Sequence, residues 1–203
     1  MKRKPVQEIR REEVRSIFDR VLKDKKVTLS PVSISVTESK DSDFTSIEFS
    51  FTDDKFTKEI CLNDARGKGF VDCLFRALHT HYVERYTSLR KIKLANLSID
   101  SQMSSSKSGT GSDATASVVF RLEVEEKGVV EFEKSSRSLV YSSFASILKA
   151  FEFYINCEAT FVKLQEILSN AEQRNRQDII EKCKFDLSKV TRMNSYEKEK
   201  RKE

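Results

Sequence analysis

Apolar and polar residues follow two different periodicities along the first part of the chain. Up to about residue 25, apolar side chains such as Val14, Ile17 and Val21 recur at steps of three and four, which predicts an amphipathic helix over residues 6–25. Apolar and polar residues then alternate, as they do in half-buried strands. The alternation predicts three strands, at residues 27–36, 44–51 and 56–62. Strands so close in sequence are expected to form an antiparallel meander.

The chain then repeats this plan. A helix that reaches about Arg85 follows the third strand, with Leu74 and Leu78 on its apolar stripe. Three further strands and a helix are predicted at residues 89–100, 115–125, 129–134 and 139–154. Each βββα unit has one apolar sheet face and one apolar helix face, so we expect the units to pack on each other or on a second subunit. The predicted fold class is therefore α+β, with two βββα repeats, antiparallel three-stranded sheets packed against helices, and flanking N- and C-terminal helices.

The pattern divides the chain into four parts. An N-terminal amphipathic basic helix is expected over residues 1–26, and the two βββα units over residues 27–156, at about 30–86 and 89–156. Apolar stripes continue after Asn156 and predict a C-terminal helical extension over residues 157–190. Residues 191–203 are charged and without a pattern, and we expect them to be a disordered tail.

Charge is concentrated at the start of the chain. Charged residues make up 34% of the sequence and the net charge is +5. The first 26 residues alone carry ten Lys and Arg against five acids, which accounts for the whole excess. Because acids interrupt the basic residues and no aromatic residues alternate with them, a solvated helix face is favoured over a nucleic-acid surface. Nucleic-acid association through this helix stays open as an alternative, and it predicts a steep dependence on salt.

Few residues suggest catalysis or metal binding. The four cysteines, Cys61, Cys73, Cys157 and Cys183, are too widely spaced for a zinc site, and Cys61 and Cys73 are expected to be buried thiols. His79 and His81 are two positions apart on a helix and have no nucleophile motif beside them. We therefore expect no catalytic residues, no metal and no cofactor. Without an apolar run of membrane length or an export signal, a cytoplasmic protein is expected.

Two glycine clusters stand at structural junctions. Gly67-Lys68-Gly69 opens the first predicted helix, where glycines expose backbone N–H groups that suit a carboxylate, although a tight turn alone also explains them. The second cluster, at residues 109–114, is typical of a flexible loop that enters a strand. Neither cluster has the spacing of a nucleotide-binding loop.

Three segments together resemble one family. GKGFVDC at residues 67–73 resembles the GxGPVDA helix start of the regulatory domain of 2-isopropylmalate synthases and citramalate synthases. GSDATA at residues 111–116 is similar to its GTDAQA segment, and LVYSSFASILKAF at residues 139–151 to its final helix. The resemblance covers residues 27–156 and implies a homodimer that binds leucine, isoleucine or a related small acid as a feedback effector. It places seven residues at the effector site: Gly67, Gly69, Asp72, Leu94, Asn96, Asp113 and Ala114.

The sequence also departs from that family. Phe70 replaces its proline, Ser135–Ser138 lacks the glycine and aspartate of its last helix start, and residues 101–109 form an inserted loop. The catalytic barrel is missing from this sequence, so we expect no condensation activity from it alone. The first functional hypothesis is a non-catalytic effector-binding protein that regulates a barrel-only synthase or another partner. The alternatives are a dimerisation scaffold that has lost the effector site, and a detached subunit that completes an active synthase.

Overall fold

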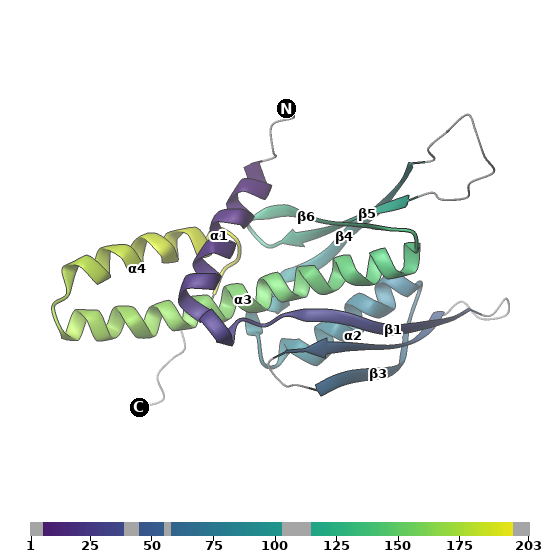
Figure 1. Ribbon diagram of the computed structural model, residues 1–203, viewed down its shortest axis with the longest axis horizontal. Helices are drawn as coiled ribbons and strands as arrows, with labels where there is room; N and C mark the ends of the chain where they lie inside the picture. The colour runs from purple at the N-terminus through teal and green to yellow at the C-terminus, as the bar shows by residue number, and fades with distance from the viewer. Residues whose placement is uncertain (1–5, 39–44, 55–57, 103–114, 197–203) are drawn as a thin grey trace.

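The computed structural model describes residues 6–38, 45–54, 58–102 and 115–196 and confirms the α+β class (Figure 1). Two three-stranded antiparallel sheets, in the orders β1-β2-β3 and β4-β5-β6, are each followed by a helix. The first unit comprises β1 (Leu29–Glu38), β2 (Thr45–Asp53), β3 (Lys58–Gly67) and α2 (Phe70–Val83). The second comprises β4 (Ile92–Gln102), β5 (Thr115–Val124), β6 (Gly128–Ser136) and α3 (Leu139–Gln173). The flanking elements are α1 (Val6–Leu22), a 3-10 turn η1 (Lys23–Lys25), a second such turn η2 (Thr87–Lys91) and α4 (Gln177–Val190).

Alternation along each strand gives each sheet one buried face. On β5, Val118, Phe120 and Leu122 are buried, whereas the intervening side chains are only partly covered. Cys61 pairs with Ser50 on β2 and is exposed, which corrects the expectation of a buried thiol there. Its neighbours along β3 are the apolar Ile60 and Leu62, so the two-residue period directs Cys61 to the outer face.

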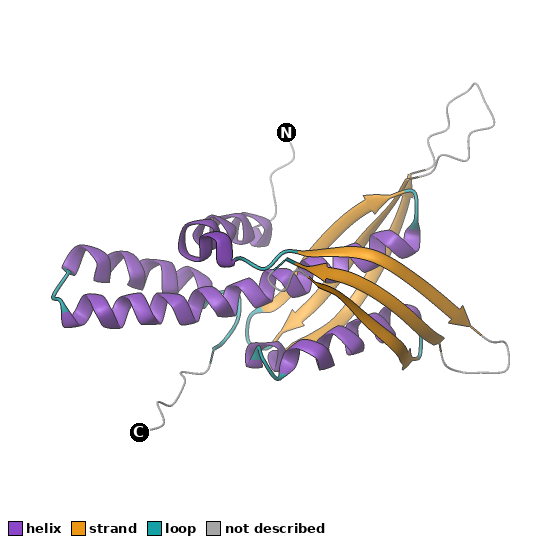
Figure 2. Ribbon diagram, turned by 60° about the horizontal axis from the view of Figure 1, so that its bottom comes forward, coloured by secondary structure: helices purple, strands orange, loops and turns teal. Residues whose placement is uncertain are grey.

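Helices α2 and α3 join the two sheets through a shared core. Helix α3 packs against β5 and β6 of one sheet and against β1 of the other, and α2 packs against β2, β3 and α3. Aromatic rings make these contacts: Phe144 of α3 lies 5.3 Å from Phe49, and Phe75 of α2 lies 6.3 Å from Phe120 and 5.5 Å from Phe151. In Figure 2 the sheets open like a V with helices between them. The two apolar sheet faces are therefore covered within one chain.

Helix α3 is longer than the expected segment at residues 139–154. It runs without a break for 35 residues and, after a turn at Arg174–Arg176, reverses into α4. Residues Asn156 and Cys157, at the expected boundary, are fully buried in the middle of this helix. The second βββα unit and the C-terminal extension thus share one helix. The helical hairpin formed by α3 and α4 projects beyond the sheets, and α1 crosses it (Figure 1).

The start of the expected disordered tail is packed. Met193 and Asn194 are almost completely buried, and the Asn194 side-chain amide donates a hydrogen bond to the Ser88 carbonyl at 3.0 Å. The ring of Tyr196 stacks on Phe161 with 4.6 Å between centroids. These contacts correct the expectation of disorder for residues 191–196. The packing of Met193 and Tyr196 and the hydrogen bond of Asn194 hold this segment in place although the tail is rich in charged residues. Residues 197–203 lie outside the described residues.

Candidate functional site

The glycine-rich start of α2 is closed by its own side chains. The Asp72 carboxylate accepts a hydrogen bond from the Lys68 backbone N–H at 3.3 Å and lies 3.7 Å from the Arg76 guanidinium. It therefore takes the place near the helix N-terminus that an anionic ligand would occupy. The structure brings Gly67 and Asp72 together, because a Cβ atom on Gly67 would lie 2.5 Å from the Asp72 carboxylate. By contrast, nothing described lies within 4 Å of a Cβ on Gly69.

Substitution of the two glycines is expected to have unequal effects. Gly67→Ala would push a methyl group against Asp72 and against the Cys73 backbone N, 3.2 Å away, and should cost about 1–3 kcal/mol of stability. Gly69→Ala is the matched control, since its backbone is extended and its surroundings are open, and it should change stability by about 0.5 kcal/mol or less. Urea denaturation of the two variants measures both effects. Equal losses would show that Gly67 is not the tightly packed position.

Leu94 and Asn96 do not join Gly67 and Asp72. His79, in the C-terminal half of α2, has its Nε2 3.1 Å from the Leu89 carbonyl, so β4 begins beside the end of α2 opposite the glycines. A bulge between Leu94 and Asn96 also separates these two residues. Leu94 pairs with the buried Leu122, whereas Asn96 is exposed and pairs with Arg121. Arg121 is next to Leu122 on β5, so Asn96 and Arg121 lie on the opposite face of the sheet from Leu94 and Leu122. The other expected residues, Asp113 and Ala114, lie outside the described residues.

The start of α3 is also capped from within the chain. The Ser138 hydroxyl accepts the Tyr141 backbone N–H at 3.2 Å, and the Ser136 hydroxyl donates to the Ser138 carbonyl at 2.8 Å. The Ser138 hydroxyl thus satisfies one N–H of the first turn of α3. The start of α2 has no such cap, but the negative charge of Asp72 lies in its first turn, so an anionic ligand would meet a carboxylate there.

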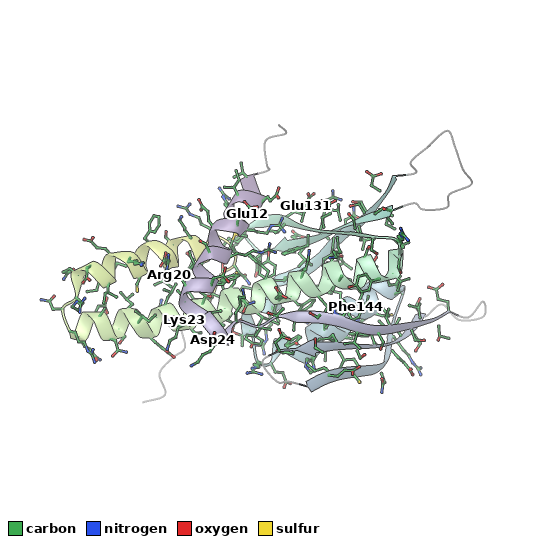
Figure 3. The ribbon with its side chains drawn as sticks, viewed as in Figure 1. Glu12, Arg20, Lys23, Asp24, Glu131 and Phe144 are labelled. Atoms are coloured by element: carbon green, nitrogen blue, oxygen red, sulfur yellow. The ribbon has the colours of Figure 1, made fainter. Side chains whose placement is uncertain are left out.

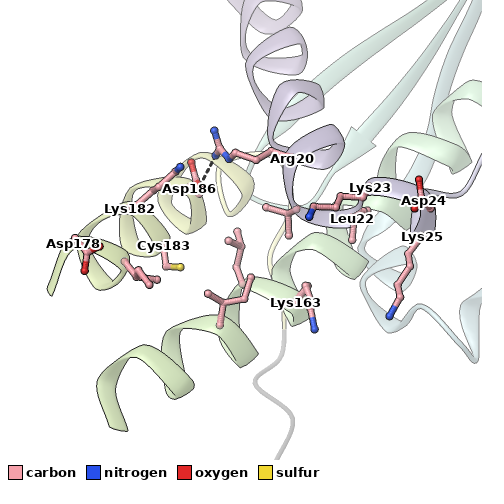
Figure 4. A pocket seen from close by; sticks show the side chains of 14 residues that line it. Arg20, Leu22, Lys23, Asp24, Lys25, Lys163, Asp178, Lys182, Cys183 and Asp186 are labelled. Carbon is pink, nitrogen blue, oxygen red and sulfur yellow. Dashed lines mark hydrogen bonds and ion pairs between the residues drawn. The ribbon is translucent and has the colours of Figure 1, made fainter. Parts of the chain in front are cut away.

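A concave feature with an apolar floor lies elsewhere, between α1, α3 and α4 (Figure 4). It is an open cavity of about 740 Å³, within the size range of small-molecule sites. We call it the helical groove. Its floor is apolar and is formed by Val21, Leu22, Leu164, Ile167, Ile179 and Cys183. Burial, followed by the nearby Asp186 carboxylate, raises the pKa of the Cys183 thiol, which therefore belongs to the apolar floor.

Charged side chains form the rim of the helical groove. Arg20 and Asp186 bind each other at 2.5 Å and tie α1 to α4, and Lys163 is paired with Glu166 on α3. The Arg176 guanidinium binds Asp178 and lowers the pKa of that carboxyl. Within the described part of the chain, no carboxylate pairs with the ammonium group of Lys23, Lys25 or Lys182. In Figure 4, Lys23 points from the end of α1 into the space between the helices, whereas Lys25 points away from it.

The groove can hold a molecule with an apolar body and an acidic end. The floor removes apolar surface from water, and an unpaired ammonium group at the rim binds a carboxylate with a charge-assisted hydrogen bond. The sequence pattern predicts the apolar stripes that contain Leu164, Ile167, Ile179 and Cys183, and Lys23 is one of the basic residues at the start of the chain. The pattern does not predict the groove itself, because only the turn at Arg174–Arg176 and the crossing of α1 bring these segments together.

Neither a metal site nor a membrane-spanning helix is found among the described residues. The structure there shows no group of three or more His, Cys, Asp and Glu side chains that could hold a metal ion. None of the described helices combines the length and the apolar composition that a membrane crossing requires. No family model and no curated protein matches this chain. The fold and the groove thus define an α+β protein of doubled βββα units with a helical hairpin.

Proposed function

We propose that this chain is a non-catalytic binding protein that takes a small organic acid with a branched apolar body, such as leucine or isoleucine, in the helical groove. The observation that carries the proposal is the combination of an apolar floor with the unpaired Lys23 ammonium group that points toward it. The ligand class is the one that the family resemblance implies. The site is different, because Asp72 already occupies the start of α2.

The arrangement of the groove also suggests how a bound acid would act. Its walls come from α1, α3 and α4, and the Arg20–Asp186 ion pair joins α1 to α4 at the rim. The Lys189–Glu13 ion pair also links α4 to α1, and an acid bound to Lys23 and to the hairpin floor would add a further link. Ligand binding would then favour one placement of α1, and a partner that contacts α1 or the hairpin would sense this population shift.

Loss of the rim charge is the direct test. Lys23→Gln keeps most of the side chain and removes its charge, so it should weaken binding of the acid about tenfold or more. Lys184→Gln is the matched control on exposed α4 surface outside the groove and should leave binding unchanged. Thermal shift and calorimetric titration with leucine, isoleucine, valine and citramalate measure the effect. A folded protein that binds none of them, or a Lys23→Gln variant that binds as well as the parent, would contradict the proposal.

A second candidate is the interaction scaffold without an effector. The observation that favours it is that the chain's own side chains lie at both helix starts: Ser138 caps α3, and the Asp72 carboxylate sits in the first turn of α2. This candidate predicts a stable homodimer in sedimentation equilibrium whose association constant does not change with any of the four acids. Regulation of a barrel-only synthase remains part of either proposal and needs that partner for its test.

A further inference from the structure

A second cleft lies on the other half of α1. It measures about 910 Å³ and is bounded by α1, by the edge strand β6 and by α3. Four cationic side chains from these three elements line it: Arg11, Arg15, Lys134 and Lys149. We call it the basic cleft. Glu131 of β6 also lines this cleft, and Figure 3 shows it beside the N-terminal half of α1.

Arg11 is held in the basic cleft with an unsatisfied donor. Its guanidinium lies over the ring of Phe132, with Cζ 4.8 Å from the ring centroid. Stacking of this kind fixes the plane of the guanidinium. The Arg11 Nε atom is buried and has no hydrogen-bond acceptor among the described residues. A buried donor without an acceptor is costly, so an oxyanion that reached it would be bound favourably.

Two cations of the cleft lie close enough to other cations for their pKa values to be lowered. Burial lowers the pKa of Lys149, and the cationic Lys134, Arg15 and Arg11 lower it further, against a raising effect of Glu152. Burial and then Arg15 lower the pKa of Arg11, while Glu8, Tyr154 and Glu131 raise it. Lys149 is therefore repelled by three neighbouring cations, and Arg11 is repelled by Arg15.

The carboxylates around the cleft are largely engaged elsewhere. Glu131 binds Arg121 at 2.6 Å, and Glu133 accepts a hydrogen bond from the Ser117 hydroxyl. Glu152 accepts the Leu29 backbone N–H at 2.9 Å. Glu8 is the remaining acid in the lining and raises the pKa of Arg11. The lining therefore carries four cationic and three acidic side chains, a small excess of positive charge.

We infer that the basic cleft binds the phosphate group of a small phosphorylated molecule. A phosphate carries close to two negative charges and three acceptor oxygens, which match cations that converge from three directions. Guanidinium groups bind phosphate through two parallel hydrogen bonds, and stacked Arg11 is set for this geometry. Three acids in the same lining, Glu8, Glu131 and Glu133, would repel a long polyanion, so the site suits a small molecule and not a nucleic acid.

Titration at constant ionic strength tests this inference. Inorganic phosphate and adenosine 5′-monophosphate are the probes, with added chloride in the reference cell. We expect saturable binding that Lys149→Gln and Lys134→Gln each weaken about tenfold. Lys93→Gln, on exposed β4 surface outside the cleft, is the control and should bind as the parent does. Stronger binding of the monophosphate than of inorganic phosphate would identify an organic phosphate as the ligand.

The same variants give a second readout. Because Lys149 is repelled by three cations, Lys149→Gln should melt at the same temperature as the parent or higher without phosphate, and should gain less from added phosphate. A merely structural lysine would give a lower melting temperature in both conditions. Absence of phosphate binding by the folded parent, equal binding by all variants, or binding of a DNA duplex alone with a steep salt dependence would each overturn the inference. Lys23→Gln should leave phosphate binding intact, which separates this site from the helical groove.

Discussion

Asn156→Leu is expected to lower the free energy of unfolding by about 2–5 kcal/mol, because it leaves two buried backbone groups without partners. The Asn156 side chain accepts the Val27 backbone N–H at 2.9 Å and donates to the Val27 carbonyl at 2.8 Å. Both residues are 1% exposed, so water cannot replace the lost hydrogen bonds. Leucine has a similar volume and adds apolar surface, yet it can satisfy neither group. Urea denaturation measures the loss.

Asn170→Leu is the control for this change. Asn170 lies on the same helix, and its side chain makes an exposed hydrogen bond to the Glu166 carbonyl. Its replacement should change stability by about 0.5 kcal/mol or less. If Asn156→Leu were equally mild, the segment between η1 and β1 would not depend on the contact with α3.

Phe120→Ala is expected to cost about 3–5 kcal/mol, which is the range for a large aromatic side chain removed from a packed core. Phe120 is completely buried on the central strand of the second sheet, and its ring faces Phe75 of the first unit. The substitution therefore opens a cavity where the two units meet. Because they share this core, we expect a single cooperative unfolding transition in the parent and in the variant.

Val129→Ala provides the comparison. Val129 is 47% exposed on β6, so the loss of its methyl groups should cost about 1 kcal/mol or less. Circular dichroism and fluorescence followed through the same urea titration would show whether the units unfold together. Two separate transitions, or a Phe120→Ala cost as small as that of Val129→Ala, would contradict the shared core.

The strands and helices were predictable from the sequence because their patterns are local. Alternation at Ile47, Phe49 and Phe51, for example, predicts one buried face on the second strand, and all three side chains are buried on β2. The length of α3 was only partly predictable. Its middle contains Asn156 and Thr160, polar residues that resemble a boundary in the sequence but are buried in the structure. The Asn156 amide is satisfied by a backbone 129 positions away, which no local pattern contains.

The arrangement of the expected effector residues was only partly predictable from the sequence. Leu94 and Asn96 share a face in a regular strand, but the bulge between them directs them to opposite faces. Gly67 and Asp72, five positions apart, do meet, since a helix start places them together. The two clefts were beyond prediction, because each needs α1 to lie against segments more than a hundred residues away.

Because α3 is unbroken, it connects the packed core between the sheets directly to the tip of the helical hairpin. At 1.5 Å per residue, its 35 residues span about 50 Å, and roughly half of that length extends past the buried Asn156. With Asn156 as the pivot, a tilt of about 5° would displace the tip of the hairpin by about 2 Å and would shift the core end in the opposite direction. If a small molecule bound in the helical groove tilted the hairpin, the part of α3 that packs between the two sheets would therefore move as well.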